Sequence, residues 1–421
     1  MNGRMKWSRF FLLAGSIVLV GATWTLAQNN SALTLKECYR LALERSEAVG
    51  IQKELIKETE GLMLQSLSTA LPKVAFAYSE KWQDVRPNNT FEGSLQEGKF
   101  TFTQPLFTGF KEFAAIGASK HVGKQRAEEL RRAQQLLFTD VSDAFYFYLS
   151  YQEDLSVQKE VQKILTDRVA DLKKRESLGK SRSSEVASAR AKLLRIDANI
   201  EASRGQMEVA GQLMEFLIGR PVEVLASEPL PVEAVDLQSL AAKADARPDV
   251  MAAREAAASY KNNITAARSS FFPAVSLTGN SYTKRLDANE GNNWDVTVNV
   301  NVPLFNGLND VGQVSQARAQ ANAADLRLSL ARRKALLEIR NAYTKLESAR
   351  KKEEALVKAA DASEENYRLQ EEDFRKSLVN NLDVLQALED VQSVRRENVA
   401  ARLDVQRAFW LLKVVTGEIA Q

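Results

Sequence analysis

Gln104-Pro105-Leu106-Phe107-Thr108-Gly109 is the stretch that decides the fold, and it has an echo in Val302-Pro303-Leu304-Phe305-Asn306-Gly307. Each copy ends a segment in which apolar and polar residues alternate. Each copy also opens a long run without proline, residues 106–220 in the first case and 304–421 in the second. Proline costs about 3 kcal/mol inside a helix, so the two runs predict very long uninterrupted helices.

The two copies belong to an internal duplication. Pro105 and Pro303 are 198 positions apart, and so are Glu185 and Asp383. A shared offset between separated features is typical of a repeat. The predicted junctions between a strand and a long helix are Pro105, Gly109, Pro303 and Gly307.

Each half predicts one β-hairpin and one pair of antiparallel helices. The first repeat, residues 28–220, is expected to hold strands over about 73–83 and 98–106 and helices over about 110–176 and 183–218. The second repeat, residues 247–421, is expected to hold strands over about 274–284 and 294–303 and helices over about 308–374 and 382–416. A linker with a short helix is expected over 221–246. A capping-box pattern at Thr34 and Glu37 predicts one further helix, which runs from there toward Ala70.

The first 27 residues are expected to be a secretory signal peptide. Arg4, Lys6 and Arg9 precede an apolar run over 10–22, and Thr25-Leu26-Ala27 offers small residues for cleavage. The run is shorter than the about 20 residues of a transmembrane helix, and an uncleaved anchor is the alternative. Removing the three basic residues takes the formal charge from +3 to zero, so the charge gives no indication of a nucleic-acid partner.

The chain has one cysteine, Cys38, and one histidine, His121. An internal disulfide is therefore impossible, and histidine-based triads and multi-histidine metal sites are excluded. The glycine-rich fragments are typical of turns rather than of phosphate-binding loops. We expect no enzymatic activity, no catalytic or metal site and no cofactor.

The strand segments have the length and pattern of membrane strands. Trp294, Val296, Val298 and Val300 alternate with polar residues, and about ten residues suffice for a tilted strand to cross a bilayer. One side of a soluble antiparallel sheet would show the same alternation. We favour a membrane sheet, because the two hairpins are predicted to be isolated and an isolated hairpin is only marginally stable in water.

Four strands cannot close a barrel, because such barrels begin at about eight strands and open edges in lipid leave backbone groups unpaired. The chain is therefore expected to form an oligomer. Two copies would supply eight strands and a filled interior, and three would supply twelve strands and room for a passage. The polar strand faces, with Thr101, Thr103, Thr297, Asn299 and Asn301, suit a wet lumen.

The long helices carry apolar seams. Val384, Ala387, Val391 and Val394 begin a 3-4 spacing that continues to Val415, which is typical of helices packed in a coiled coil. An ordinary antiparallel coiled coil would show the same pattern by itself.

Taken in order along the chain, these motifs resemble the TolC family of outer-membrane efflux proteins over essentially all of the sequence after the predicted signal peptide. The resemblance is carried by Leu33-Thr34-Leu35-Lys36-Glu37, Leu41-Ala42-Leu43-Glu44, the two Pro-Leu-Phe-x-Gly junctions, Leu217-Ile218-Gly219-Arg220-Pro221, Arg247-Pro248-Asp249 and Val415-Thr416-Gly417. It implies a mainly α fold with a membrane β-barrel portion, in which two duplicated halves close into a trimeric β-barrel and α-barrel.

The resemblance also implies a function and partners. The protein would be the outer-membrane exit duct of a tripartite efflux or type I secretion system, a passive channel that extends into the periplasm of a Gram-negative-type cell. It would form a homotrimer, contact outer-membrane lipid, and dock on an inner-membrane pump through a periplasmic adaptor, the membrane fusion protein. The exposed turns 177–184 and 377–381 are the expected places of contact.

The family closes its periplasmic tip near the two helix-helix turns, with acidic and aromatic residues. By this resemblance Asp383 and Glu185 are the acidic aperture candidates, Phe374 is the aromatic one, and Gln386 stands where a second aspartate is known. Three copies of Asp383, joined by Glu185, would form an acidic ring, and rings of carboxylates favour cations. In a simpler interpretation the two carboxylates cap the returning helices, and both roles can hold together. Ser377 departs from the family, which usually has glycine there.

Two other classes of protein share some of these features. A periplasmic adaptor also combines a long helical hairpin with β structure, although it would need one contiguous soluble β domain. A structural coiled-coil protein would leave the alternation of Phe100 to Leu106 and of Trp294 to Val302 unexplained.

Overall fold

The computed structural model of the chain describes residues 32–82, 94–222, 224–229, 236–285 and 291–419. The expected signal peptide, residues 1–27, lies outside the described residues.

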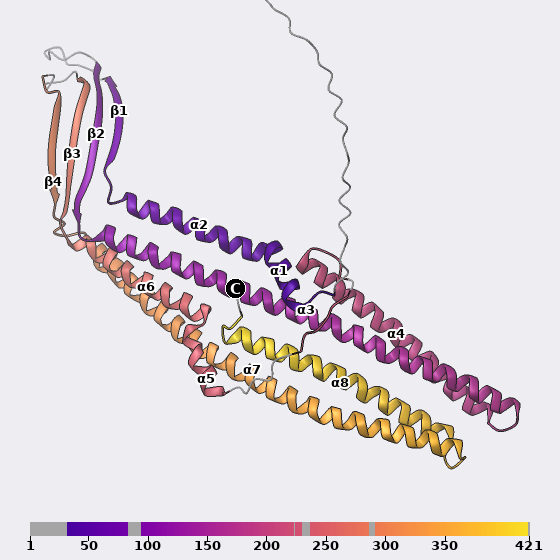
Figure 1. Cartoon of the computed structure of the whole chain (residues 1–421). Coiled ribbons are helices and arrows are strands. Elements are labelled where there is room, and N and C mark those ends of the chain that lie inside the picture. Colours follow the sequence, from indigo (N-terminus) through magenta and orange to yellow (C-terminus); the bar gives the residue numbers. More distant parts are fainter. Residues whose placement is uncertain (1–31, 83–93, 223, 230–235, 286–290, 420–421) are drawn as a thin grey trace, which may run out of the picture.

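The molecule is long, with four strands at one end and two helix-helix turns at the other (Figure 1). Helices α3 (Lys111–Ser177) and α7 (Asn309–Arg375) each have 67 residues and run the whole way between the two ends. At 1.5 Å per residue each is about 100 Å long. Helices α4 (Ser183–Ile218) and α8 (Asn381–Val415) return from the turns over about half of that length. The predicted pairs of long antiparallel helices are confirmed.

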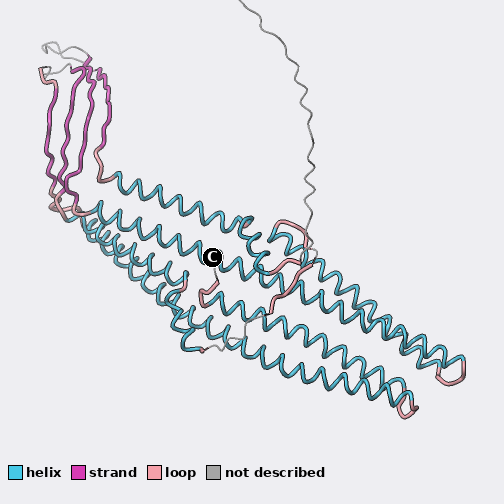
Figure 2. Tube along the Cα trace, in the orientation of Figure 1, coloured by secondary structure: helices cyan, strands magenta, loops and turns pink. Residues whose placement is uncertain are grey.

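The helices form one layer. The layer is four helices wide both in the half of the molecule next to the strands and in the half next to the helix-helix turns. In the half next to the strands, α2 (Glu47–Ser68) packs on α3, α3 on α6 (Pro248–Arg268) and α6 on α7. In the other half, α4 packs on α3, α3 on α8 and α8 on α7. Figure 2 shows the same order in the Cα trace. Helices α2 and α4 therefore lie at one edge of the layer, and α7 lies at the other edge along its full length.

The single helix expected from Thr34 toward Ala70 is wrong. The structure has α1 (Leu35–Arg45) and α2, separated at Ser46. The hydroxyl of Ser46 accepts a hydrogen bond from the backbone N–H of Val49 at 3.3 Å, so this serine ends one helix and caps the next. The capping box at Thr34 is confirmed as the start of α1.

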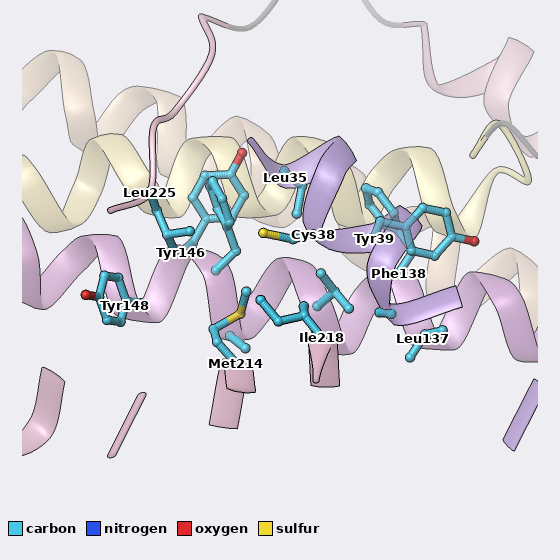
Figure 3. Close-up of a cluster of buried hydrophobic side chains, with 14 of the residues drawn as sticks. Leu35, Cys38, Tyr39, Leu137, Phe138, Tyr146, Tyr148, Met214, Ile218 and Leu225 are labelled. Atoms are coloured by element: carbon cyan, nitrogen blue, oxygen red, sulfur yellow. The ribbon is translucent and has the colours of Figure 1, made fainter. Parts of the chain in front are cut away.

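The break at Ser46 lets α1 fold onto the middle of the layer, where it contacts α3 and α4. Its Cys38 is fully buried against a cluster that includes Phe138, Met214 and Ile218 (Figure 3). On the other side of the layer, α5 (Leu237–Ala242) and the 3-10 helix η1 (Lys243–Ala246) lie against α7. A second 3-10 helix, η2 (Ser269–Phe271), follows α6. The apolar cores therefore sit between helices of one layer.

The expectation of two isolated hairpins is wrong, because the strands form one antiparallel sheet in the order β1-β2-β3-β4. These are β1 (Lys73–Trp82), β2 (Ser94–Thr108), β3 (Ala274–Arg285) and β4 (Trp294–Asn301). Strand β2 leads into α3, and β3 follows α6. Because α3 and α6 pack together, the two hairpins meet along β2 and β3, which also extends β2 beyond its predicted bounds.

The register sorts the side chains of the sheet onto two faces. Phe102 is opposite Gly279, which is opposite Val296, and these positions share an apolar face with Val74 and Trp294. Val74 is 71% exposed and Trp294 is 69% exposed. The protomer therefore leaves this apolar face uncovered.

The polar face lies behind it and is hydrogen-bonded across the strands. Thr101 on β2 is opposite Asn280 on β3, which is opposite Asp295 on β4. Nearer the helices, the side-chain amide of Asn299 donates to the hydroxyl of Thr278 at 3.3 Å.

Candidate functional site

The first predicted aperture residue, Glu185, caps helix α4. Its carboxylate accepts hydrogen bonds from the hydroxyl of Ser181 and from the backbone N–H of Arg182, the latter at 3.2 Å. The hydrogen bond from Ser181 is the largest reason that the pKa of Glu185 lies below its usual value, and the backbone N–H of Asn381 adds to this. Glu185 therefore lies beside Asn381, the first residue of α8, which precedes Asp383 by two residues in the sequence.

Asp383 has the equivalent capping role in α8. The backbone N–H of Asn380 donates to its carboxylate at 3.1 Å, and its own N–H donates to the side-chain oxygen of Asn380 at 3.2 Å. Asp383 is exposed in the protomer. The capping interpretation of both carboxylates is confirmed, and the acidic ring stays a prediction.

Phe374, the aromatic candidate, is 8% exposed. The guanidinium carbons of Arg168 and Arg175, both on α3, lie 4.4 Å and 4.9 Å from the centre of its ring. A cation over an aromatic face is attracted to the ring, by about 0.5–2 kcal/mol. Phe374 therefore joins α7 to α3.

The two arginines are functional candidates that were missed in the sequence. Arg168 donates to the side-chain oxygen of Asn381 at 3.0 Å and lies 3.9 Å from the carboxylate of Glu371. With Tyr367 and Phe374 they line a cleft of about 620 Å³. Burial lowers the pKa of Arg168 and raises the pKa of Tyr367 to about 12. Arg168 and Arg175 have a spacing of seven residues, and so do Tyr367 and Phe374, which places each pair on one face of its own helix. The spacing does not indicate that the two faces meet.

Gln386 is exposed, and its side-chain amide donates to Asp390 of its own helix at 3.1 Å. Ser377 in the turn between α7 and α8 has φ 63°, in the left-handed region that favours glycine. This explains physically why a glycine is expected at that position.

Each predicted strand-helix junction contains two successive residues in the left-handed region. Gly109 and Phe110 have φ 67° and 66°, and Gly307 and Leu308 have φ 59° and 66°. The surroundings of the two glycines differ. A Cβ added to Gly109 would lie 2.8 Å from the Cβ of Phe272, whereas one added to Gly307 would meet nothing within 4 Å.

The two junction prolines also differ. Pro105 lies within β2, next to an irregularity in its pairing with β3, whereas Pro303 follows the end of β4 at Asn301. Ala274, the first residue of β3, is opposite Thr108 of β2 and Asn301 of β4, so β2 ends after Pro105 whereas β4 ends before Pro303.

No group of three or more His, Cys, Asp or Glu side chains in the described ranges is placed to hold a metal ion. Among the helices that the structure describes, none has both the length and the apolar character to cross a membrane.

The chain matches the family model described as "Outer membrane efflux protein" over residues 39–220 and 241–418. It is 22% identical to the outer membrane efflux protein BepC of Brucella suis, over 85% of this chain and 81% of the relative. It is also 22% identical to the alkaline protease secretion protein AprF of Pseudomonas aeruginosa, over 95% of this chain and 88% of the relative.

The fold is also similar to that of a solved structure, a membrane protein from Pseudomonas aeruginosa. The TM-score is 0.83 at 19% identity, with 92% of each chain covered. The two halves of the family match fall on the two repeats described above. The chain therefore belongs to the outer membrane efflux protein family, as its resemblance to TolC-type sequences predicts.

Proposed function

We propose that the protein is an outer-membrane exit duct, a passive channel that continues from a strand barrel in the membrane into a helical barrel across the periplasm. The observation that carries the proposal is the sheet, whose outer strands β1 and β4 each pair on one side only within the described protomer. Its apolar face is exposed over the height of a membrane strand. In lipid such a sheet is stable only when further strands close it.

The edges of the helical layer support the same closure. At one edge, Leu64 of α2 is 68% exposed and Phe216 of α4 is 70% exposed. At the other edge, Leu326 and Leu330 of α7 are 72% and 57% exposed. Apolar side chains at both edges suit a head-to-tail ring, in which one edge of each copy packs on the opposite edge of the next.

We propose three copies in the ring, as the family resemblance implies. Three sheets of four strands would give a barrel of twelve, which leaves room for a passage, whereas two would give eight and an interior filled by side chains. The polar face with Thr101, Asn280 and Asp295 would line the passage, and the apolar face would contact outer-membrane lipid.

The proposed partners are an inner-membrane pump, which supplies the energy, and a periplasmic adaptor. They would be reached by the turns between α3 and α4 and between α7 and α8, which lie at the end of the molecule opposite the sheet. The names of the two relatives, one for efflux and one for secretion of a protease, support an efflux or type I secretion system. We propose that the chain itself has no enzymatic role and that passage depends on the opening of the tip.

The two alternative classes of protein fit the sheet less well. A periplasmic adaptor would need one contiguous soluble β domain. The four strands do form one sheet, but an apolar face as exposed as that of Val74 and Trp294 would be unstable in water. A structural coiled-coil protein would give the sheet no role.

The test is single-channel conductance of the detergent-purified protein in a planar bilayer, with the oligomeric mass measured on the same sample. Discrete conductance steps from a trimer are expected. A soluble monomer or dimer that never conducts would overturn the proposal.

A matched pair of variants tests the proposed edge contact. Leu330→Arg places a charge on the exposed edge of α7 and should convert the trimer to monomers that keep their helical content. Leu178→Arg places the same charge at the tip, where Leu178 is 63% exposed, and should leave the trimer intact. Loss of the trimer in both variants, or in neither, would contradict the edge contact.

A further inference from the structure

A cluster of charged side chains lies on the polar face of the sheet, at the end remote from the helices. We call Glu97, Lys99, Tyr282, Arg285 and Asp295 the mouth cluster. Glu97 is paired with Arg285 across β2 and β3, and Lys99 is paired with Tyr282. Asp295 is the second residue of β4, so three strands contribute to the cluster.

The members of the cluster contact one another directly. The ammonium of Lys99 lies 2.8 Å from the carboxylate of Glu97. The hydroxyl of Tyr282 donates to Asp295 at 2.6 Å, and the guanidinium carbon of Arg285 lies 4.1 Å from the centre of the Tyr282 ring. Lys99 and Glu97 keep only 31% and 29% of their side-chain surface exposed. The charged groups of the mouth cluster are therefore held in place on the polar face of the sheet.

A row of hydrogen bonds across the strands holds Asp295 at its own level of the sheet. The hydroxyl of Thr101 donates to the side-chain oxygen of Asn280 at 2.9 Å, and the side-chain amide of Asn280 donates to Asp295 at 2.9 Å. Both carboxylate oxygens of Asp295 thus have a donor, from Asn280 and from Tyr282. These two donors favour the orientation in which the carboxylate of Asp295 stays on the polar face of the sheet.

The formal charges of the cluster balance. Lys99 and Arg285 are positive, and Glu97 and Asp295 are negative. Lys81 of β1 is opposite Leu95, so it lies on the same face at the same end of the sheet and adds one positive charge beside the cluster. A single neutralising substitution in the cluster would change its charge by one in each protomer.

We propose that the mouth cluster is a second selectivity element of the channel, at the outer end of the passage. This inference rests on the proposed function, because the polar face of the sheet must line a passage. In a trimer the three copies place these charges of both signs in a ring, which contributes, beside the periplasmic tip, to the preference of the channel between cations and anions. Fixed charges around a pore set its ion preference.

The sheet supplies a matched control at the same height. Lys284 precedes Arg285, yet it is paired with Gly98, on the opposite face from Lys99. The irregularity between Gly98 and Lys99 is the reason that Lys284 and Tyr282, two residues apart, lie on opposite faces. The ammonium of Lys284 donates to the side chain of Gln96, away from the cluster.

The experiment measures the reversal potential of single channels in a KCl gradient, with the trimer mass recorded on each sample. Arg285→Gln removes three positive charges from the ring and should raise the ratio of potassium to chloride permeability by about twofold. Asp295→Asn removes three negative charges and should lower the ratio by a similar factor, while its remaining side-chain oxygen keeps an acceptor. Lys99→Gln should act in the same direction as Arg285→Gln, and Lys284→Gln should not change the ratio.

The outcomes separate this inference from the function on which it rests. Opposite shifts in Arg285→Gln and Asp295→Asn, with no shift in Lys284→Gln, support it. Conducting trimers whose permeability ratio is unchanged in all variants, or changes equally in Lys284→Gln, overturn the mouth cluster and leave the duct intact. A wild-type protein that does not conduct overturns both.

Discussion

Arg396 of α8 donates two hydrogen bonds to the carboxylate of Asp154 on α3, which is only 9% exposed. The same carboxylate accepts from Gln158, which is fully buried, and from the hydroxyl of Ser203 on α4 at 2.9 Å. Three helices of the layer are therefore joined by one buried carboxylate.

Replacing Asp154 should destabilise the middle of the layer. Asp154→Ala leaves the buried donors of Gln158 and Ser203 without their acceptor, which costs about 1–3 kcal/mol. We expect faster hydrogen exchange of the backbone amides near 154 on α3 and near 396 on α8. The matched control is Glu153→Ala, because Glu153 pairs with Arg402 at the exposed rim of the same two helices. That pair should contribute less than about 1 kcal/mol, and equal effects of the two substitutions would contradict the special role of Asp154.

Asp249 should make stability depend on pH. Burial acts to raise the pKa of Asp249, but hydrogen bonds and charge from Arg247 outweigh it and hold the pKa below its usual value. Arg247 is 1% exposed and donates to Asp249 at 2.7 and 3.0 Å. A lowered pKa stabilises the folded state above the unfolded value of about 3.9, and this contribution is lost as the pH falls through the folded value.

The variant Asp249→Asn should therefore unfold at a lower temperature than wild type at pH 7, and the difference should shrink below about pH 4. The measurement is the midpoint of thermal unfolding at both pH values. Asp245→Asn is the control, because Asp245 is 63% exposed and pairs with Arg332 at the surface. A difference for Asp249→Asn that stays constant down to pH 2 would contradict the ion pair as its source.

The two junction glycines should respond unequally to alanine. Gly109→Ala and Gly307→Ala both place a side chain in the left-handed region, which costs about 1–2 kcal/mol. Gly109→Ala must in addition displace Phe272 and the backbone of Ser269, both within 3.0 Å of the added Cβ. We expect Gly109→Ala to lower the midpoint of denaturant unfolding clearly more than Gly307→Ala. Equal losses would indicate that the two junctions are equivalent.

The long helices could be predicted closely from the proline-free runs together with the turn residues 177–181. The first was predicted to run to about residue 176, and the structure ends α3 at Ser177. The pattern failed at Ser46, because a serine inside an apolar periodicity is compatible with both a helix interior and a cap. The packing of α1 on α3 and α4 decides that Ser46 caps a helix and does not lie inside one.

The pairing of the two hairpins could not be predicted from the sequence, for a different reason. Alternation along β2 and β3 gives the faces of each strand but not its neighbour, since period-two patterns are compatible with any partner. The partner is decided by the contact of α3 with α6, which lie far apart in the chain. The candidate site shows the same limit of the sequence. Asp383 and Phe374 could be identified by resemblance, whereas Arg168 and Arg175 could be identified only once the structure showed which helix they face.

The last prediction separates the two roles of the tip carboxylates. Asp383→Asn removes the charge but keeps an oxygen that can accept from the N–H of Asn380, and Glu185→Gln likewise keeps an acceptor for Ser181. If three copies of each carboxylate ring a narrow entrance, the double variant should lose cation preference by about twofold or more while hydrogen exchange at the first turns of α4 and α8 stays as in wild type. Asp383→Ala should lose both the preference and the hydrogen bond from the backbone N–H of Asn380, with faster exchange of that amide. Unchanged cation preference in the conducting double variant would leave Glu185 and Asp383 as helix caps and nothing more, because charge lining a narrow entrance cannot be removed without changing which ions pass.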